Sequence, residues 1–472
     1  VASRPLAELW CGVSVVGMSR PISWIPLSKR SLFWCLFDAG HWGFNSVTMA
    51  TLIPYMFKTM LPVHTGYTTP ALWGYLMAGS TLVGALLGPY VGAYADFTEN
   101  RKHFLFIALG IQAVAVFSFV LFGLFNWVVS IFLVCAALIS GLLVMALYNA
   151  MIMFTEETDD IAQTSVWGTG LSSLGSALLM TGLGMAWLSP VDLTPGYFLM
   201  CTVAAAAWQG VFCVPLFRGI EEPPSGYPVM EPEQIKDEVH NSIRDMFQNR
   251  ELVKLTVALL VFNDASTTMW TMHVVYGSYL GIPGASLFGA QVLNRWMSVP
   301  FCLLWAKLAD RYTSRTNTIL AIGVTLICCV LFMFLKTQWE YYGLSVLLAL
   351  AGTGIFIFTR VLMADLTPTR RAGQNFGILA AVNKLAGFVG PLVYAIVTDI
   401  FGSPRAGFGV LLMFAAGGLF LLMQVDIDAA TAQAHSDPVP EGPGNTHYAR
   451  HEDLEHHTDP LGNLGSSRPS SH

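Results

Sequence analysis

Long apolar runs separated by short polar stretches dominate the chain. A helix needs about 20 apolar residues to cross the hydrocarbon core of a bilayer. The runs of this kind are residues 32–58, 71–95, 104–126, 128–154, 166–188, 196–217, 252–276, 285–309, 318–336, 342–364, 376–400 and 406–425. Several neighbouring runs are joined by only a few residues, so they must be antiparallel. The pattern predicts an all-α membrane protein with twelve transmembrane helices in two six-helix halves.

The polar stretches divide the chain into five parts. We expect an irregular N-terminal segment, a first six-helix half, a linker with a surface helix over 231–249, a second six-helix half and a disordered tail rich in Pro, Gly, Ser, His and acidic residues. A signal peptide over Leu9–Met18 is the alternative for the first part. The five parts are residues 1–31, 32–218, 219–251, 252–425 and 426–472.

Basic residues are unevenly distributed among the predicted loops. Cytoplasmic loops of membrane proteins carry an excess of Lys and Arg. Loops after odd-numbered spans hold little beyond Lys58, Lys336 and Arg405. Loops after even-numbered spans hold Arg101, Lys102, Arg218, Lys236, Arg244, Arg250, Arg311, Arg315, Arg370 and Arg371. We therefore expect both termini and the linker to face the cytosol.

Composition supports a lipid environment and excludes several classes of function. Hydrophobic residues make up 54% of the chain and charged residues 11%, against about 25% charged residues in soluble domains. The net charge is −6 and no basic stripe is present, which argues against a nucleic-acid partner. The histidines of the tail are either a metal site or, as we favour, part of a solvated low-complexity segment. We expect a monomer in the bilayer, with no metal.

No motif for a cofactor or for catalysis is present. The sequence contains no Gly-x-x-x-x-Gly-Lys-Ser/Thr stretch, so ATP is not expected to supply energy within this chain. Paired His-x-x-His segments and a Gly-x-Ser-x-Gly stretch are also missing, which argues against a membrane enzyme. A secondary transporter is the leading hypothesis, and a transporter-like solute sensor that signals through the linker or the tail is an alternative.

Two loops repeat one pattern, in which a small residue stands four positions before an Asp and basic residues follow. The small residue lets a neighbouring helix approach closely. The copies are Gly92, Asp96, Arg101 and Lys102 after the second span, and Ala306, Asp310, Arg311 and Arg315 after the eighth. A second repeated pair consists of Asp38 in the first span and Asp264 in the seventh. Each pair has the same rank in its half, which predicts two related halves.

These loops resemble the signature loop of the major facilitator superfamily. The first copy has Glu99 and Asn100 where that family often has Gly and Arg, and the second has Ala306 in place of Gly. The resemblance implies the major facilitator fold. It also implies that the loop aspartates lock the two halves together in one access state.

A closer resemblance, over residues 31–425, is to the vacuole-effluxer branch, the autophagy-related vacuolar amino-acid exporters. It implies alternating-access transport of neutral amino acids, with or without proton coupling, in a vacuolar or lysosome-like membrane; a plasma-membrane location fits the same residues. The stretches that carry it are Trp34–Ala39, Asn45-Ser46, Gly92–Asp96, Tyr148–Ala150, Thr169–Gly175, Phe262–Asp264, Thr359-Arg360, Phe376-Gly377, Lys384, Gly390-Pro391 and Gly402–Arg405.

Acidic residues inside the predicted spans mark a candidate cavity. A charge at mid-membrane costs about 3 kcal/mol or more unless it is paired or faces water. Asp38, His41 and Asn45 share one face of the first span, and Asp264 and Thr268 share one face of the seventh. We expect these stripes to line a cavity between the halves. The aspartates then bind a proton or a substrate amino group, or else they form permanent ion pairs and helix–helix ties.

The basic residues that lie away from the ends of the spans all fall in the second half. They are Arg295, Arg360 and Lys384. Arg360 is expected either to hold a substrate carboxylate in bidentate fashion or to pair with an aspartate. Two acids and three bases suit a zwitterion, although sugars, nucleosides and organic anions also bind polar cavities. Asn149, at the end of the fourth span, is a candidate for the cytosolic gate.

Overall fold

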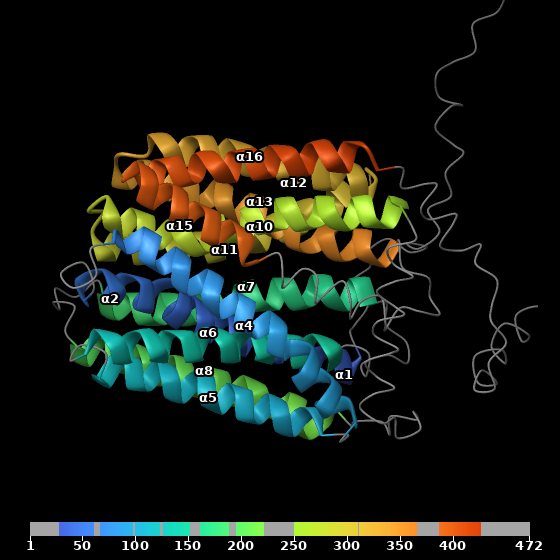
Figure 1. Ribbon diagram of the computed structural model, residues 1–472. Helices are drawn as coiled ribbons and strands as arrows, with labels where there is room; N and C mark the ends of the chain where they lie inside the picture. The colour runs from blue at the N-terminus through green and yellow to red at the C-terminus, as the bar shows by residue number, and fades with distance from the viewer. Residues whose placement is uncertain are drawn as a thin grey trace, which may run out of the picture.

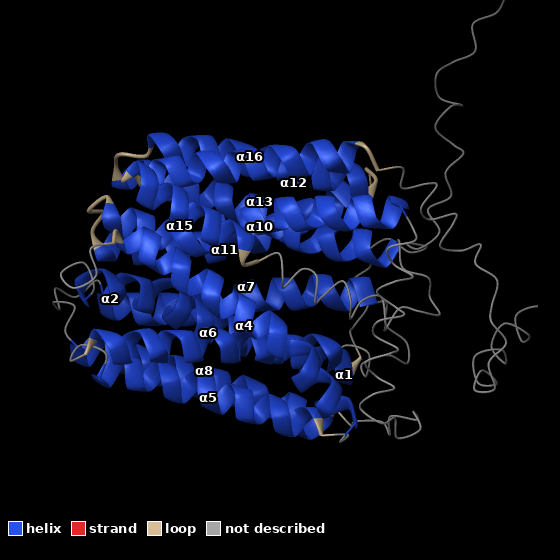
Figure 2. Ribbon diagram, in the orientation of Figure 1, coloured by secondary structure: helices blue, strands red, loops and turns tan. Residues whose placement is uncertain are grey.

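The protein is described here by a computed structural model, which shows helices and connecting turns throughout the described part of the chain (Figure 2). The residues described are 28–60, 67–97, 100–122, 126–151, 161–187, 195–220, 250–309, 311–365 and 387–425. The predicted N-terminal segment, the linker helix and the C-terminal tail lie almost wholly outside these ranges.

The described helices form two groups that follow the order of the chain. The first group lies on one side of the molecule and the second on the other, with their long axes roughly aligned (Figure 1). The first group is α1 (Lys29–Val47), η1 (Thr48–Leu52), α2 (Ile53–Met60), α4 (Thr69–Phe97), α5 (Arg101–Phe122), α6 (Trp127–Ala150), α7 (Ile161–Trp187) and α8 (Pro195–Gly219). The second group is α10 (Arg250–Tyr279), α11 (Gly284–Ala309), α12 (Ser314–Phe334), α13 (Gln338–Asp365), α15 (Val389–Phe401) and α16 (Pro404–Met423).

The helix ends follow local capping chemistry rather than the ends of the apolar runs. Asn126 accepts hydrogen bonds from the backbone N–H groups of Val128 and Val129 at the start of α6, and Thr313 caps α12 in the same way. Gly402 ends α15 with a φ of 60°, a left-handed conformation that glycine adopts without strain. Most helices therefore begin a few residues before the predicted spans, whereas several, such as α5 and α6, end before the predicted limit.

The first span contains a π-helical turn that the apolar pattern did not predict. α1, η1 and α2 follow one another without a break, and the π turn covers Thr48–Leu52. The hydroxyl of Thr51 donates to the carbonyl of Ser46 over 2.7 Å. Pro54 lies two residues after this turn and has no backbone N–H to donate, so the wider turn accommodates the missing bond.

Seven described helices are long and apolar enough to cross a membrane. They are Thr69–Gly92, Arg101–Phe122, Trp127–Asn149, Gly196–Gly219, Ser314–Phe334, Gln338–Thr359 and Pro404–Met423. α1, α7, α10 and α11 are not among these seven, and α1, α10 and α11 carry buried charged residues, Asp38, Asp264 and Arg295 respectively. Polar side chains within the membrane turn toward the protein interior, so these less apolar helices surround the candidate site.

The two groups repeat the same packing. α1 packs against α8, and α10 packs against α16, which pairs the first and last spans of each half. In each half, a basic side chain at the start of one helix bonds to the end of the last helix. Lys102 Nζ of α5 donates to the carbonyl of Phe217 in α8 over 3.2 Å, and Arg315 of α12 donates to the carbonyl of Met423 in α16 over 2.8 Å. Both cations lie at a helix C-terminus, where the helix dipole favours positive charge. The loop cations of the sequence repeat thus occupy equivalent positions.

The halves meet closely at the end of the bundle where α2 ends and α11 begins, on the left in Figure 1. We call it the α2 end. A Cβ on Gly284 of α11 would lie 2.7 Å from the ring of Tyr55 in α2. The indole N–H of Trp73, near the start of α4, donates to the carbonyl of Thr271 in α10. The described contacts therefore close the boundary between the halves at this end.

Candidate functional site

Asp264 is buried at the contact between α10 and α15. Its side chain is 4% exposed, and its Oδ2 accepts a hydrogen bond from the backbone N–H of Gly390. Gly390 lies in the first turn of α15, where unpaired N–H groups and the helix dipole favour an anion. The end of one helix therefore helps to hold a carboxylate on another.

Two oxygen atoms beside this contact have no hydrogen-bond partner. They are Oδ1 of Asp264 and Oγ1 of Thr268, one helical turn further along α10. Both face Gly390, where a Cβ would lie 2.7 Å from Asp264 Oδ1 and closer still to Thr268 Oγ1. Buried polar atoms are nearly always satisfied in proteins. The pair can accept a hydrogen bond from a proton carrier or from an ammonium group.

Asp38, the counterpart of Asp264 in the first half, is also buried. Its side chain is 2% exposed, and its Oδ2 faces α7, 3.5 Å from the position of a Cβ on Gly168. Asp38 thus lies at the contact between α1 and α7. The structure places each aspartate of the predicted pair where the first helix of its half packs on a neighbour.

His41 and Asn45 belong to a hydrogen-bonded network inside the first half. The Asn45 amide nitrogen lies 2.9 Å from His41 Nε2 and also donates to the carbonyl of His41. Asn45 Oδ1 accepts from Gln112 of α5 over 3.0 Å, and the Gln209 amide of α8 lies 3.1 Å from His41 Nδ1. Each ring nitrogen of His41 thus has a side-chain amide beside it, and which of the two carries the proton depends on the tautomer. The network joins three helices and leaves both ring nitrogens partnered.

A second histidine network lies in the other half. His273 Nδ1 donates to the carbonyl of Trp270 over 2.6 Å, and the side-chain amide of Gln291 contacts His273 Nε2. The ring of His273 stacks on Tyr341 of α13 with a centroid separation of 6.3 Å. α10, α11 and α13 are thereby tied together near the boundary between the halves.

Arg295 lies beside this network, between aromatic rings of both halves. Its guanidinium carbon is 4.7 Å from the ring centroid of Trp270 in α10 and 5.9 Å from that of Trp42 in α1. Trp42 also packs edge-on against Phe356 of α13. The side chain of Arg295 is 8% exposed. A single cation is thus held by one ring from its own half and one from the opposite half.

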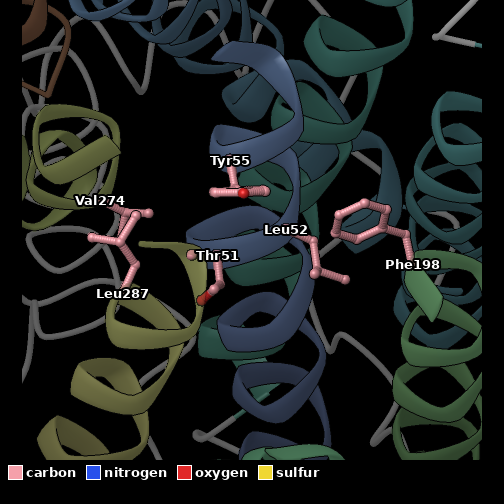
Figure 3. Close-up of a pocket in the computed structure, with 7 residues that line it drawn as sticks. Thr51, Leu52, Tyr55, Phe198, Val274 and Leu287 are labelled. Carbon is pink, nitrogen blue, oxygen red and sulfur yellow. The ribbon is translucent and has the colours of Figure 1, made fainter. Parts of the chain in front are cut away.

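A small pocket of about 10 Å³, with room for about one water molecule, lies between the halves at the α2 end. In Figure 3, Thr51, Leu52 and Tyr55 lie on one helix, with Val274 and Leu287 on one side and Phe198 on the other. The Thr51 hydroxyl is already bonded to the carbonyl of Ser46. With its largely apolar lining, the pocket is poorly suited to a polar solute.

The remaining predicted residues are placed as follows. Asn149 is exposed near the end of α6, Arg101 is the first residue of α5, and Arg311 lies in the turn before α12. The side chains of Asp96, Arg360, Lys384 and Asp310 lie outside the described residues, so their roles stay predictions.

Several residues of these networks were not predicted from the sequence. Gln112, Gln209 and Gln291 are isolated amides within long apolar stretches, and an isolated amide in a span is itself a signal of a helix–helix tie. His273 lies nine positions after Asp264 and was not grouped with it on one face of the helix. Trp42 and Trp270 could not be found from sequence, because aromatic residues in spans are common packing residues.

The family comparison covers most of the chain. Residues 67–435 match the family described as "Vacuole effluxer Atg22 like". The uncharacterized MFS-type transporter YxiO of Bacillus subtilis is 27% identical over 409 residues, which cover 84% of this chain and 94% of YxiO. Autophagy-related protein 22 of Candida albicans is 21% identical over 411 residues, or 79% of each chain.

Solved structures share the architecture at low sequence identity. The crystal structure of a D-xylose-proton symporter superimposes with a TM-score of 0.64, at 14% identity, and covers 89% of this chain and 99% of its own. At that identity the similarity concerns the fold alone.

Proposed function

Because the chain belongs to the Atg22-like vacuole effluxers of the major facilitator superfamily, we propose that this transporter carries neutral amino acids by alternating access. The family and the fold are those of membrane transporters, not enzymes. The solute site of such carriers lies near the midplane, between the halves. Two observations support a site there: Arg295 lies between Trp42 of the first half and Trp270 of the second, and Asp264 lies on α10, a helix that also contacts α4 of the first half.

The unpartnered oxygens of Asp264 and Thr268 carry the proposal. An ammonium group supplies three donors, and a carboxylate beside a hydroxyl accepts two of them. The hydrogen bond from Gly390 already holds the carboxylate in place. An amino group that reaches these oxygens when the site opens gains charge-assisted hydrogen bonds.

Proton coupling is the second use of the same carboxylate. A proton on Asp264 removes the charge that otherwise has to be stabilised in a buried place. Proton and amino group then compete for one site, which couples their movements. Without this competition, the carrier equilibrates its solute across the membrane.

The membrane and the orientation are also proposals. Relatives named for autophagy support a vacuolar membrane, and a plasma membrane suits the same helices. The distribution of loop cations supports a cytosolic position for both termini. In that orientation the closely packed α2 end faces away from the cytosol.

Other polar solutes form the alternative class. The fold is shared with a D-xylose-proton symporter, so a sugar, a nucleoside or an organic anion is the competing substrate. A transporter-like sensor would bind its solute without moving it.

Uptake and counterflow in proteoliposomes test the proposal. The purified full chain is reconstituted and offered labelled neutral amino acids, sugars and nucleosides, with and without a pH gradient. We expect counterflow of at least one neutral amino acid. Absence of any amino-acid signal beside a clear sugar or nucleoside signal overturns the substrate class, and binding without counterflow favours the sensor.

Variants of α10 connect that result to the site. Asp264→Asn and Thr268→Val are expected to reduce amino-acid counterflow by about tenfold or more, because each removes a charged or polar acceptor. Thr267→Val, at an exposed position of the same helix, is the matched control. If Asp38→Asn and Asp264→Asn both leave transport and its pH dependence unchanged, proton coupling is excluded.

A further inference from the structure

Arg295 is a buried cation with no partner for its charge among the described residues. Its Nε is buried and makes no hydrogen bond. Its contacts in the described part of the chain are the ring faces of Trp42 and Trp270. A cation–π contact is worth about 2 kcal/mol when desolvated, whereas burying a charge costs several kcal/mol. The two rings therefore offset only part of that cost.

The groups around Arg295 do not supply the missing anion. Trp42 faces it from α1 and Trp270 from α10, and both are neutral. His273 has one ring nitrogen on the Trp270 carbonyl and the other on Gln291, so it offers no acceptor to the guanidinium. Asp264 makes no ion pair with Arg295: one of its carboxylate oxygens accepts from Gly390 and the other has no partner in the described part of the chain. The environment suits a ligand that brings its own negative charge.

We propose that Arg295 binds the carboxylate of the transported solute at the boundary between the halves. The inference rests on the proposed transport function and specifies its substrate class as carboxylate-bearing. A guanidinium presents parallel donors that match the two oxygens of a carboxylate. Neutral sugars and nucleosides bring no such charge.

The position of Trp42 connects this binding to the transport cycle. Trp42 belongs to the first half, whereas Arg295 and Trp270 belong to the second. When the halves move relative to each other, Trp42 is the ring that leaves the guanidinium. Arg295 then loses part of its stabilisation, and a bound carboxylate matters more. The affinity for carboxylates therefore differs between the two access states.

Competition among three related small molecules tests the proposal on the full-length protein. Labelled L-leucine is the probe, and the competitors are isocaproate, which lacks the amino group, and L-leucinol, which lacks the carboxylate. We expect isocaproate to compete and L-leucinol to bind at least tenfold more weakly than L-leucine. Charge-assisted hydrogen bonds of this kind correspond to about 10- to 100-fold in affinity.

Variants of α11 separate a binding role from a packing role. Arg295→Gln should reduce the preference for L-leucine over L-leucinol to about one, a ratio that a loss of packing alone does not change. Arg295→Lys keeps the charge between the rings but loses the paired donors, so an intermediate preference is expected. Lys307→Gln removes an exposed cation of the same helix and should keep the full preference.

The possible outcomes distinguish the role of Arg295 from the transport of amino acids. Equal competition by L-leucinol in the unmodified protein, or a preserved preference in Arg295→Gln, overturns the role of Arg295 while amino-acid transport stands. Binding of isocaproate without binding of any amino acid overturns the amino-acid proposal and supports Arg295. Counterflow of sugars or nucleosides alone, with no carboxylate bound, overturns both.

Discussion

The carboxylate of Asp264 accepts a hydrogen bond from the backbone of Gly390, although 126 positions separate the two residues in the chain. The contact joins α10 to the first turn of α15. It is close because residue 390 has no side chain: a Cβ there would meet both Asp264 and Thr268. The position of the carboxylate thus depends on a glycine in another helix.

Gly390→Ala should displace Asp264 and reduce transport by about tenfold or more. The added methyl group would lie 2.7 Å from Asp264 Oδ1, far inside van der Waals contact, and overpacking of this kind costs about 1–3 kcal/mol. Counterflow and thermal melting measure the two effects. Gly417→Ala is the control, because a Cβ there meets nothing within 4 Å. Equal behaviour of the two variants would contradict the role of Gly390.

Gly74→Val should favour opening of the boundary at the α2 end. A Cβ at residue 74 would lie 2.8 Å from the Cβ of Ala395 and 2.9 Å from the carbonyl of Pro391, both in the other half. The expected result is faster maleimide labelling of a cysteine introduced at Thr51, which lines the pocket in Figure 3 and is 3% exposed. Labelling is measured in a background without native cysteines.

The control for this change lies on the same helix. A Cβ at Gly79 has no neighbour within 4 Å, so Gly79→Val should leave the labelling rate unchanged. Unchanged labelling in Gly74→Val would show that closure at this end does not depend on the α4–α15 contact.

Gln209→Leu should destabilise the first half by about 1–3 kcal/mol, because it leaves a nitrogen of the buried His41 ring without its partner. Thermal melting of the purified protein measures the effect. Gly210→Ala, at the next position of α8 with open space around it, should be neutral or slightly stabilising. A melting temperature unchanged in Gln209→Leu would show that the network contributes little.

His41→Gln tests whether this network also titrates. A glutamine keeps hydrogen-bonding capacity and removes the ionisable ring. Since both ring nitrogens of His41 are already partnered within the first half, the pH profile of transport should be retained. Loss of the pH dependence in this variant would assign the titrating group to His41.

Lys102→Met and Arg315→Met should each lower stability by about 0.5–1 kcal/mol, since each removes a cation from a helix C-terminus. The bonds lost end on the carbonyls of Phe217 and Met423. Thermal melting of each single variant and of the double variant should give additive losses, because the sites lie in different halves. The exposed Lys307→Met is the control, and a double variant that melts like the unmodified chain would contradict the prediction.

Much of the fold follows from the sequence. Apolar runs of membrane-spanning length located most helices to within a few residues, because backbone polar groups in lipid must be satisfied within a helix. The repeated loops and aspartates indicated two related halves. Lys102 and Arg315 make equivalent hydrogen bonds in these halves. The π turn at Thr48–Leu52 was not foreseen, since apolar periodicity does not register one added residue in a turn.

By itself, the sequence determined which charged residues within the spans require a partner or water, because an unpaired charge in lipid is too costly to retain. Asp38, Asp264 and Arg295 are among them. Only the tertiary structure decided their partners. Asp264 meets Gly390, and Arg295 stands between Trp42 and Trp270, through contacts between helices far apart in the chain. Helical periodicity defines the face of a single helix, whereas partners across a boundary depend on how twelve predicted spans pack together.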